Sequence, residues 1–142
     1  MTAHRSEPST VPAAHRQAKY QVRFDWASAG ASAVAADADV VVWVDALADE
    51  PVEAAIELVP GAGDLLAAGA LVDALATLGI DYSSPEAAAA CAAFTGLRGA
   101  VAHLLTASVS GQERIAAGAD AAELAGAGRL ATASEVRVLR AG

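Results

Sequence analysis

The stretch Val40-Val41-Val42-Trp43-Val44-Asp45 decides the fold that this sequence predicts. It holds five apolar residues in a row, four of them β-branched, followed by an acid. Such a run is typical of a β-strand that is buried on both faces. Strands of this kind belong to sheets covered by helices, where ligands bind outside the carboxyl ends of the strands. Asp45 is expected at that end, either as a magnesium- or phosphate-site residue or as the acid that leads into the next loop.

A second strand-like run, residues 20–26, precedes this stretch. Between the two runs, the small residues 28–36 predict a short helix capped by Ser28. Together they predict a β-α-β unit, whose connection is right-handed if its strands are parallel. Near the carboxyl end, the apolar residues at 136–139 predict a last strand at a sheet edge.

The rest of the chain carries helix signals. Acids, serines or prolines stand where helices begin, and glycines stand where they end. The predicted helices run from Asp49 to Leu58, from Asp64 to Leu78, from Ser84 to about Thr95, along the face of Leu97, Val101, Leu104 and Leu105, from Ser110 to Ala117, and from Asp120 to Gly126. We therefore predict an α/β fold with a small mixed sheet, packed by several C-terminal helices.

Composition bounds the domain organisation and the partners. A chain of 142 residues suits one domain, which we expect at 19–142 behind a disordered N-terminal tail at 1–18. The net charge of −8 argues against nucleic acid or an anionic membrane as a partner. No signal peptide and no uncharged apolar run of membrane-spanning length is evident. Cys91 is the only cysteine and is expected to be a small buried residue in a cytoplasmic protein.

Four charged residues are candidates for a site. Asp45 and Asp64 both stand at element ends, and carboxylates are the ligands that Mg²⁺ prefers. Asp64 has an alternative reading as a plain helix cap, and the two roles can coexist. Arg23 and Asp25 share one strand face by the period-2 rule, so they either form an ion pair or present Arg23 to an anionic substrate.

The segment QVRFDWASAGASAVAADADVVVWVDAL, at 21–47, resembles the start of the 2-phosphosulfolactate phosphatase family in its actinobacterial form. Residues 64–75, 84–94 and 110–125 are similar to later segments of that family, in the same order. The family's central segments have no counterpart, and its serine- and threonine-rich run is replaced by Ala48-Asp49-Glu50-Pro51. The resemblance therefore implies an incomplete version of the family fold.

The resemblance also implies a function. A family member would be a Mg²⁺-dependent phosphatase that hydrolyses 2-phospho-3-sulfolactate to sulfolactate and phosphate, a step toward coenzyme M. Asp45 and Asp64 would hold the metal and act in catalysis, while Arg23 and Asp25 would bind the small anionic substrate. The alternative is a non-catalytic remnant that acts as a binding or oligomerisation module. Because missing strands would expose sheet edges, a homodimer is also expected.

Overall fold

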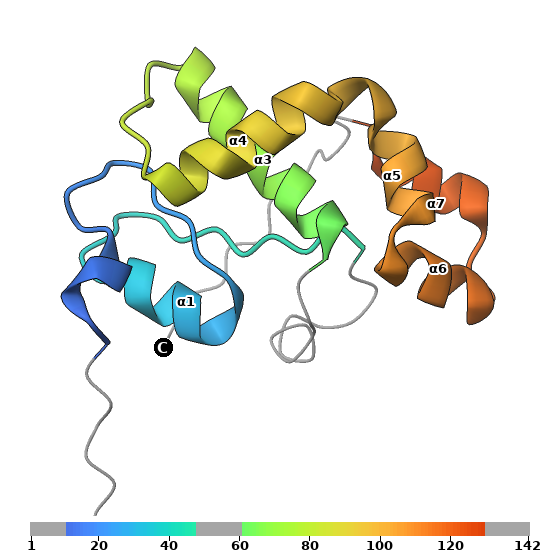
Figure 1. The fold of residues 1–142 in the computed structure, drawn as a ribbon, viewed down its shortest axis with the longest axis horizontal. Coiled ribbons are helices and arrows are strands. Elements are labelled where there is room, and N and C mark those ends of the chain that lie inside the picture. Colours follow the sequence, from blue (N-terminus) through green and yellow to red (C-terminus); the bar gives the residue numbers. More distant parts are fainter. Residues whose placement is uncertain (1–10, 48–60, 130–142) are drawn as a thin grey trace, which may run out of the picture.

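The computed structural model describes residues 11–47 and 61–129. Within these ranges the regular elements are all helical (Figure 1). They are η1 (Ala13–Arg16), α1 (Ala27–Val34), α3 (Ala62–Thr77), α4 (Pro85–Leu97), η2 (Arg98–Ala100), α5 (Val101–Ala107), α6 (Val109–Ala116) and α7 (Ala121–Ala127). The short helix η1 lies inside the range assigned to the N-terminal tail. The predicted helix from Asp49 to Leu58 and the predicted strand at 136–139 lie outside the described residues.

The predicted α/β fold is wrong for the described part of the chain, which contains helices and no sheet. The run at 20–26 touches another extended segment at one point, a parallel bridge between Val22 and Ser83. Val22 N–H donates to the Tyr82 carbonyl at 3.1 Å, and Ser84 N–H donates to the Val22 carbonyl at 2.8 Å. One bridge does not extend into a ladder, so this run is extended backbone and not a strand.

A side chain takes the place of the next strand partner. The Gln17 amide donates from Nε2 to the Phe24 carbonyl at 2.8 Å, and its Oε1 accepts from Phe24 N–H at 3.1 Å. Gln17 is buried and has a positive φ of 51°. The backbone of Phe24 thus obtains from one amide the two hydrogen bonds that a neighbouring strand would otherwise supply.

The segment Val40–Val44 is extended but has no ladder partner among the described residues. It runs from the end of α1 toward the α5 side of the molecule (Figure 1). Val40, Val41 and Val42 are 77%, 54% and 57% exposed. β-branched residues favour strands because they pack on a pleated surface, and here no such surface is supplied. A buried central strand was therefore the wrong interpretation of this run.

Helices α3 and α4 form the centre of the molecule, where they pack against each other and cross steeply (Figure 1). Gly79 has a φ of 82° in the turn after α3, a conformation that suits glycine. Ser84 caps α4, since its Oγ accepts from Ala87 N–H at 3.1 Å. These boundaries confirm the predicted start of α4 at Ser84 and the predicted stop of α3 at Gly79, whereas α3 begins at Ala62, two residues before the predicted start at Asp64.

Small residues bring the two helices together. A Cβ built on Gly69 would overlap the Ala90 carbonyl and would lie 2.7 Å from the Phe94 Cβ. Ala87 and Ala90 are fully buried on the facing helix. Arg98 and Asp73 add an exposed ion pair of 2.9 Å between the ends of the pair. The alanine- and glycine-rich composition thus has a packing role in this close helix contact.

Apolar residues gather at the two ends of the α3–α4 pair. The first cluster is built on Val22, Val72 and Ala87, with Phe24, Leu75, Ile80 and Cys91 packed against it. The second is built on Phe94, Val101 and Leu105, with Ala46, Leu47 and Ala70 packed against it. The half-buried position of Cys91 against the first cluster agrees with its expected role as a small core residue.

Helices α5, α6 and α7 form a compact group at one end of the molecule (Figure 1). Ser108 caps α6 by accepting from Gly111 N–H, and Asp120 caps α7 by accepting from Ala122 N–H. The predicted starts were therefore correct to within two residues.

One run among the described residues, Pro85–Ala116, is long and apolar enough to span a membrane by length and composition alone. Its mean hydropathy is 1.4 and 22% of the window is buried. The run comprises α4, η2, α5 and α6, with a helix cap at Ser108 inside it. The absence of a membrane partner stays a prediction from charge.

Candidate binding site

Asp64 lies in the first turn of α3 and uses both carboxylate oxygens on backbone. Its Oδ2 accepts from Gly61 N–H at 2.7 Å, and its Oδ1 accepts from Ala46 N–H at 2.9 Å. The first bond satisfies a donor at the start of α3, as a capping carboxylate does. The second ties the end of the valine segment to the start of this helix. Asp64 therefore has a structural role across two parts of the chain.

Asp45 reaches the same corner, because it directly precedes Ala46. Its Oδ1 accepts from Leu47 N–H at 3.3 Å, which stabilises the turn that follows the extended segment. Asp45 precedes Ala46, the residue that Asp64 binds, so the two predicted magnesium ligands lie in the same region. Both of their carboxylates accept hydrogen bonds from backbone N–H groups. Among the described residues, no three acidic, histidine or cysteine side chains come together as a metal site. These donors do not fit a magnesium centre.

Arg23 binds carbonyls and thereby holds the N-terminal part of the chain together. Its guanidinium donates to the carbonyl oxygens of Tyr20 at 3.0 Å, Ala36 at 2.8 Å, and Val34 and Ala18 at 3.2 Å each. Four carbonyls occupy the donors that a bound anion would need. The predicted role in substrate binding is not visible in this arrangement.

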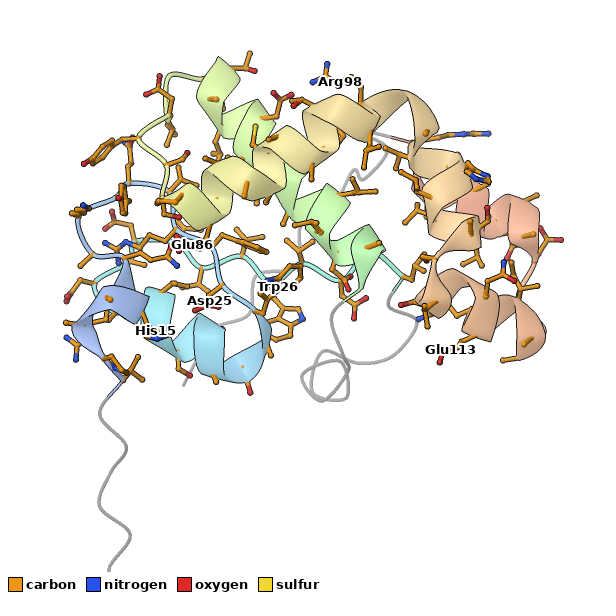
Figure 2. The ribbon with its side chains drawn as sticks, viewed as in Figure 1. His15, Asp25, Trp26, Glu86, Arg98 and Glu113 are labelled. Atoms are coloured by element: carbon orange, nitrogen blue, oxygen red, sulfur yellow. The ribbon has the colours of Figure 1, made fainter. Side chains whose placement is uncertain are left out.

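Asp25 lies at the start of α1, near Trp26 (Figure 2). Its Oδ1 accepts from Trp26 N–H at 2.7 Å. A Cβ on Gly30 would lie 2.7 Å from the Asp25 Cγ, so this glycine makes room for the carboxylate. The described residues contain no ion pair between Arg23 and Asp25.

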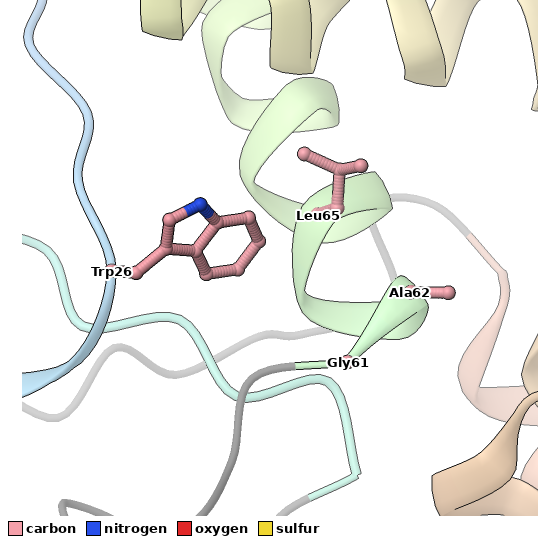
Figure 3. Close-up of a pocket in the computed structure, with 4 residues that line it drawn as sticks. All are labelled: Trp26, Gly61, Ala62 and Leu65. Atoms are coloured by element: carbon pink, nitrogen blue, oxygen red, sulfur yellow. The ribbon is translucent and has the colours of Figure 1, made fainter.

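A shallow apolar recess of about 460 Å³ lies between Trp26 and the first turn of α3. Gly61, Ala62 and Leu65 line it, and the indole faces them across it (Figure 3). Trp26 is 39% exposed. Its ring packs edge-on against Phe24 with centroids 4.8 Å apart. The recess offers no charged side chain that would select a ligand.

The feature that stands out as a binding surface is the valine segment, Val40–Val44. Within the described part of the chain, none of its backbone N–H groups donates a hydrogen bond. Its first three side chains are exposed, while Ala46 and Leu47 beyond it are anchored in the second cluster. The segment is thus fixed at its carboxyl end by packing, while Val40, Val41 and Val42 are exposed to solvent.

The sequence predicts a strand in this segment but places it in the wrong environment. An uninterrupted valine run is typical of a doubly buried strand, and the signal against burial is the acids on both sides of the run. Asp37 and Asp39 precede it and Asp45 follows it, and charged residues are among the features that protect exposed strand edges.

Comparisons with known proteins found no matching family model, no matching curated protein and no matching solved structure.

Proposed function

We propose that this chain is a non-catalytic binding module that accepts an extended peptide along Val40–Val44. The observation that carries the proposal is that three consecutive exposed valines lie on backbone whose N–H groups are unused among the described residues. An added strand would pair with those groups and cover the apolar side chains, as in β-strand addition.

The charges beside the valine segment define the chemistry of its partner. Asp37 and Asp39 stand at one end and Asp45 at the other, in a chain of net charge −8. Opposite charges on paired strands attract, whereas like charges repel. The partner that fits is therefore an extended peptide with apolar residues at its centre and lysine or arginine at its ends.

Phosphatase activity, which the family resemblance implied, has weaker support. Asp64 and Arg23 would be needed for metal and anion binding, and both are hydrogen-bonded to backbone. Phosphoryl transfer depends on positioned charges, so residues already bonded elsewhere contribute little to it. A thermal melt with Mg²⁺ and sulfolactate checks this. A stabilising shift that Asp45→Ala abolishes would favour the phosphatase over the module.

The module is tested with a labelled synthetic peptide of alternating valine and threonine flanked by lysines, measured by fluorescence anisotropy. Neighbouring residues of a strand direct their N–H groups to opposite edges. Val41→Pro and Val42→Pro therefore remove donors on opposite edges. We expect one of the two to weaken binding by about fivefold or more, the effect of one hydrogen bond.

Val109→Pro is the matched control. Val109 is as exposed as Val40, at 77%, and is the first residue of α6, where proline is well tolerated. Binding should be unchanged in this variant and should fail for a peptide whose lysines are replaced by glutamates. Equal affinity for all three proline variants, or for both peptides, would contradict the proposal. Affinity that depends on protein concentration would point to a second copy of the chain as the partner.

A further inference from the structure

The recess between Trp26 and the first turn of α3 lies beside the carboxyl end of the valine segment. The Asp64 carboxylate connects the two, because its Oδ2 accepts from Gly61 N–H at 2.7 Å and its Oδ1 accepts from Ala46 N–H at 2.9 Å. Gly61 lines the recess, and Ala46 directly follows Asp45 at the end of the valine segment. A peptide strand that pairs with the valine segment therefore has one end next to the recess.

The lining of the recess favours an uncharged apolar group. Its described wall consists of Trp26, Gly61, Ala62 and Leu65, none of which is charged. Its volume of about 460 Å³ lies within the range of about 300–1,000 Å³ that is usual for ligand pockets. Trp26 is 39% exposed, so part of its surface remains available to a partner. Tryptophan is also among the residues that most often carry the binding energy of an interface.

We propose that this recess is the specificity pocket of the module, and that it takes one large apolar side chain, such as leucine, from the peptide that pairs with the valine segment. The inference rests on the proposed function, since it names the peptide residue that the same site selects. In β-strand addition, main-chain hydrogen bonds supply affinity, whereas pockets for individual side chains supply specificity. The acids beside the valine segment select the charged ends of the peptide, and the recess selects an apolar residue next to one of those ends.

The experiment compares three lysine-flanked peptides on the full-length chain by fluorescence anisotropy. The parent peptide has threonine beside the lysines at both ends. The other two carry leucine in place of the first or of the last of these threonines, because the two possible strand directions bring opposite ends of the peptide to the recess. Burial of the leucine side chain should raise the affinity of one of these two peptides about tenfold over the parent.

Two variants of the wall should remove that gain. Trp26→Ala and Leu65→Ala each take apolar contact area from the recess, so the leucine and parent peptides should bind each variant with affinities within about twofold of each other. Tyr82→Ala is the matched control, because Tyr82 is a 55% exposed aromatic residue that does not line the recess. The tenfold gain should persist in this control. Unchanged helix content by circular dichroism shows that each variant is folded.

The outcomes separate this inference from the proposed function. Equal affinity of all three peptides for the wild-type chain would overturn the specificity pocket and retain the peptide-binding module. A gain from leucine that both Trp26→Ala and Leu65→Ala retain would also overturn the pocket, because the leucine would then bind elsewhere. Binding of none of the three peptides would reject the proposed function and the pocket together.

Discussion

Asp64 shows how one side chain can join distant parts of this chain. Its carboxylate accepts from Gly61 at the start of α3 and from Ala46 at the end of the valine segment. We expect Asp64→Asn to lower the free energy of unfolding by about 1–3 kcal/mol, because one of the two N–H groups then faces an amide donor. Urea denaturation measures the change.

Asp73→Asn is the control for Asp64, since it removes a carboxylate that is 36% exposed and paired with a 55% exposed Arg98. Exposed ion pairs contribute about 0–1 kcal/mol, so the loss should be small. Equal losses in the two variants would mean that the Asp64 bonds do not hold the segment to the helix.

Gln17 is the second residue whose role depends on geometry. Gln17→Glu keeps the acceptor for Phe24 N–H but cannot donate to the Phe24 carbonyl when ionised. The expected loss at neutral pH is about 1–3 kcal/mol of stability, measured in urea. Gln21→Glu makes the same chemical change at an exposed position and should stay within about 0.5 kcal/mol. If Gln17→Glu left the stability unchanged, the Gln17 amide would not be replacing the hydrogen bonds of a neighbouring strand.

At the scale of elements, the close contact of α3 and α4 requires Gly69. Gly69→Ala would place a methyl group into the Ala90 carbonyl, which is backbone and cannot move aside cheaply. Overpacking of this kind typically costs about 1–3 kcal/mol, and we expect at least that loss.

Gly96→Ala is the opposite case within the same helix pair. A Cβ at Gly96 in α4 meets no other atom within 4 Å. The substitution should raise stability by about 0.5–1 kcal/mol, because alanine is the better helix former. Thermal unfolding of Gly69→Ala and Gly96→Ala shows whether each change raises or lowers the stability. A tolerated Gly69→Ala would show that the two helices are farther apart than described.

At the scale of the whole molecule, the two apolar clusters share the same helices. Val72 and Ala87 place α3 and α4 in the first cluster, while Ala70 and Phe94 place them in the second. A change in either cluster should therefore destabilise the whole domain. We expect Leu105→Ala to lower stability by about 2–5 kcal/mol in a single transition.

Two probes test this cooperativity. Circular dichroism reports all helices, whereas tryptophan fluorescence reports Trp26 and Trp43 on the N-terminal side. The two melting curves should coincide in the wild-type chain and in Leu105→Ala. Separate transitions would mean that the α5–α7 group unfolds independently of the first cluster.

Sequence alone determined the helices from α3 onward. Asp64, Ser84 and Asp120 mark helix starts, and Gly79 and Gly118 mark the turns that follow, with φ of 82° and 104°. These signals are local, because a cap satisfies backbone groups within its own turn and glycine permits a left-handed turn by itself. The sequence also predicts that Asp64 binds backbone N–H groups near the start of a helix, which is one of the two roles considered for it.

Only the tertiary structure determined the hydrogen-bond partners of the valine run and of the candidate site residues. A strand exists only when a neighbour completes its hydrogen bonds, and the neighbour is not written in the run itself. Gln17 completed those bonds for Phe24, whereas no described residue did so for Val40–Val44. Arg23 and Asp64 were recognised as charged residues of interest, but their backbone partners lie up to eighteen positions away. Long-range contacts of that kind depend on how the helices pack, which local pattern does not specify.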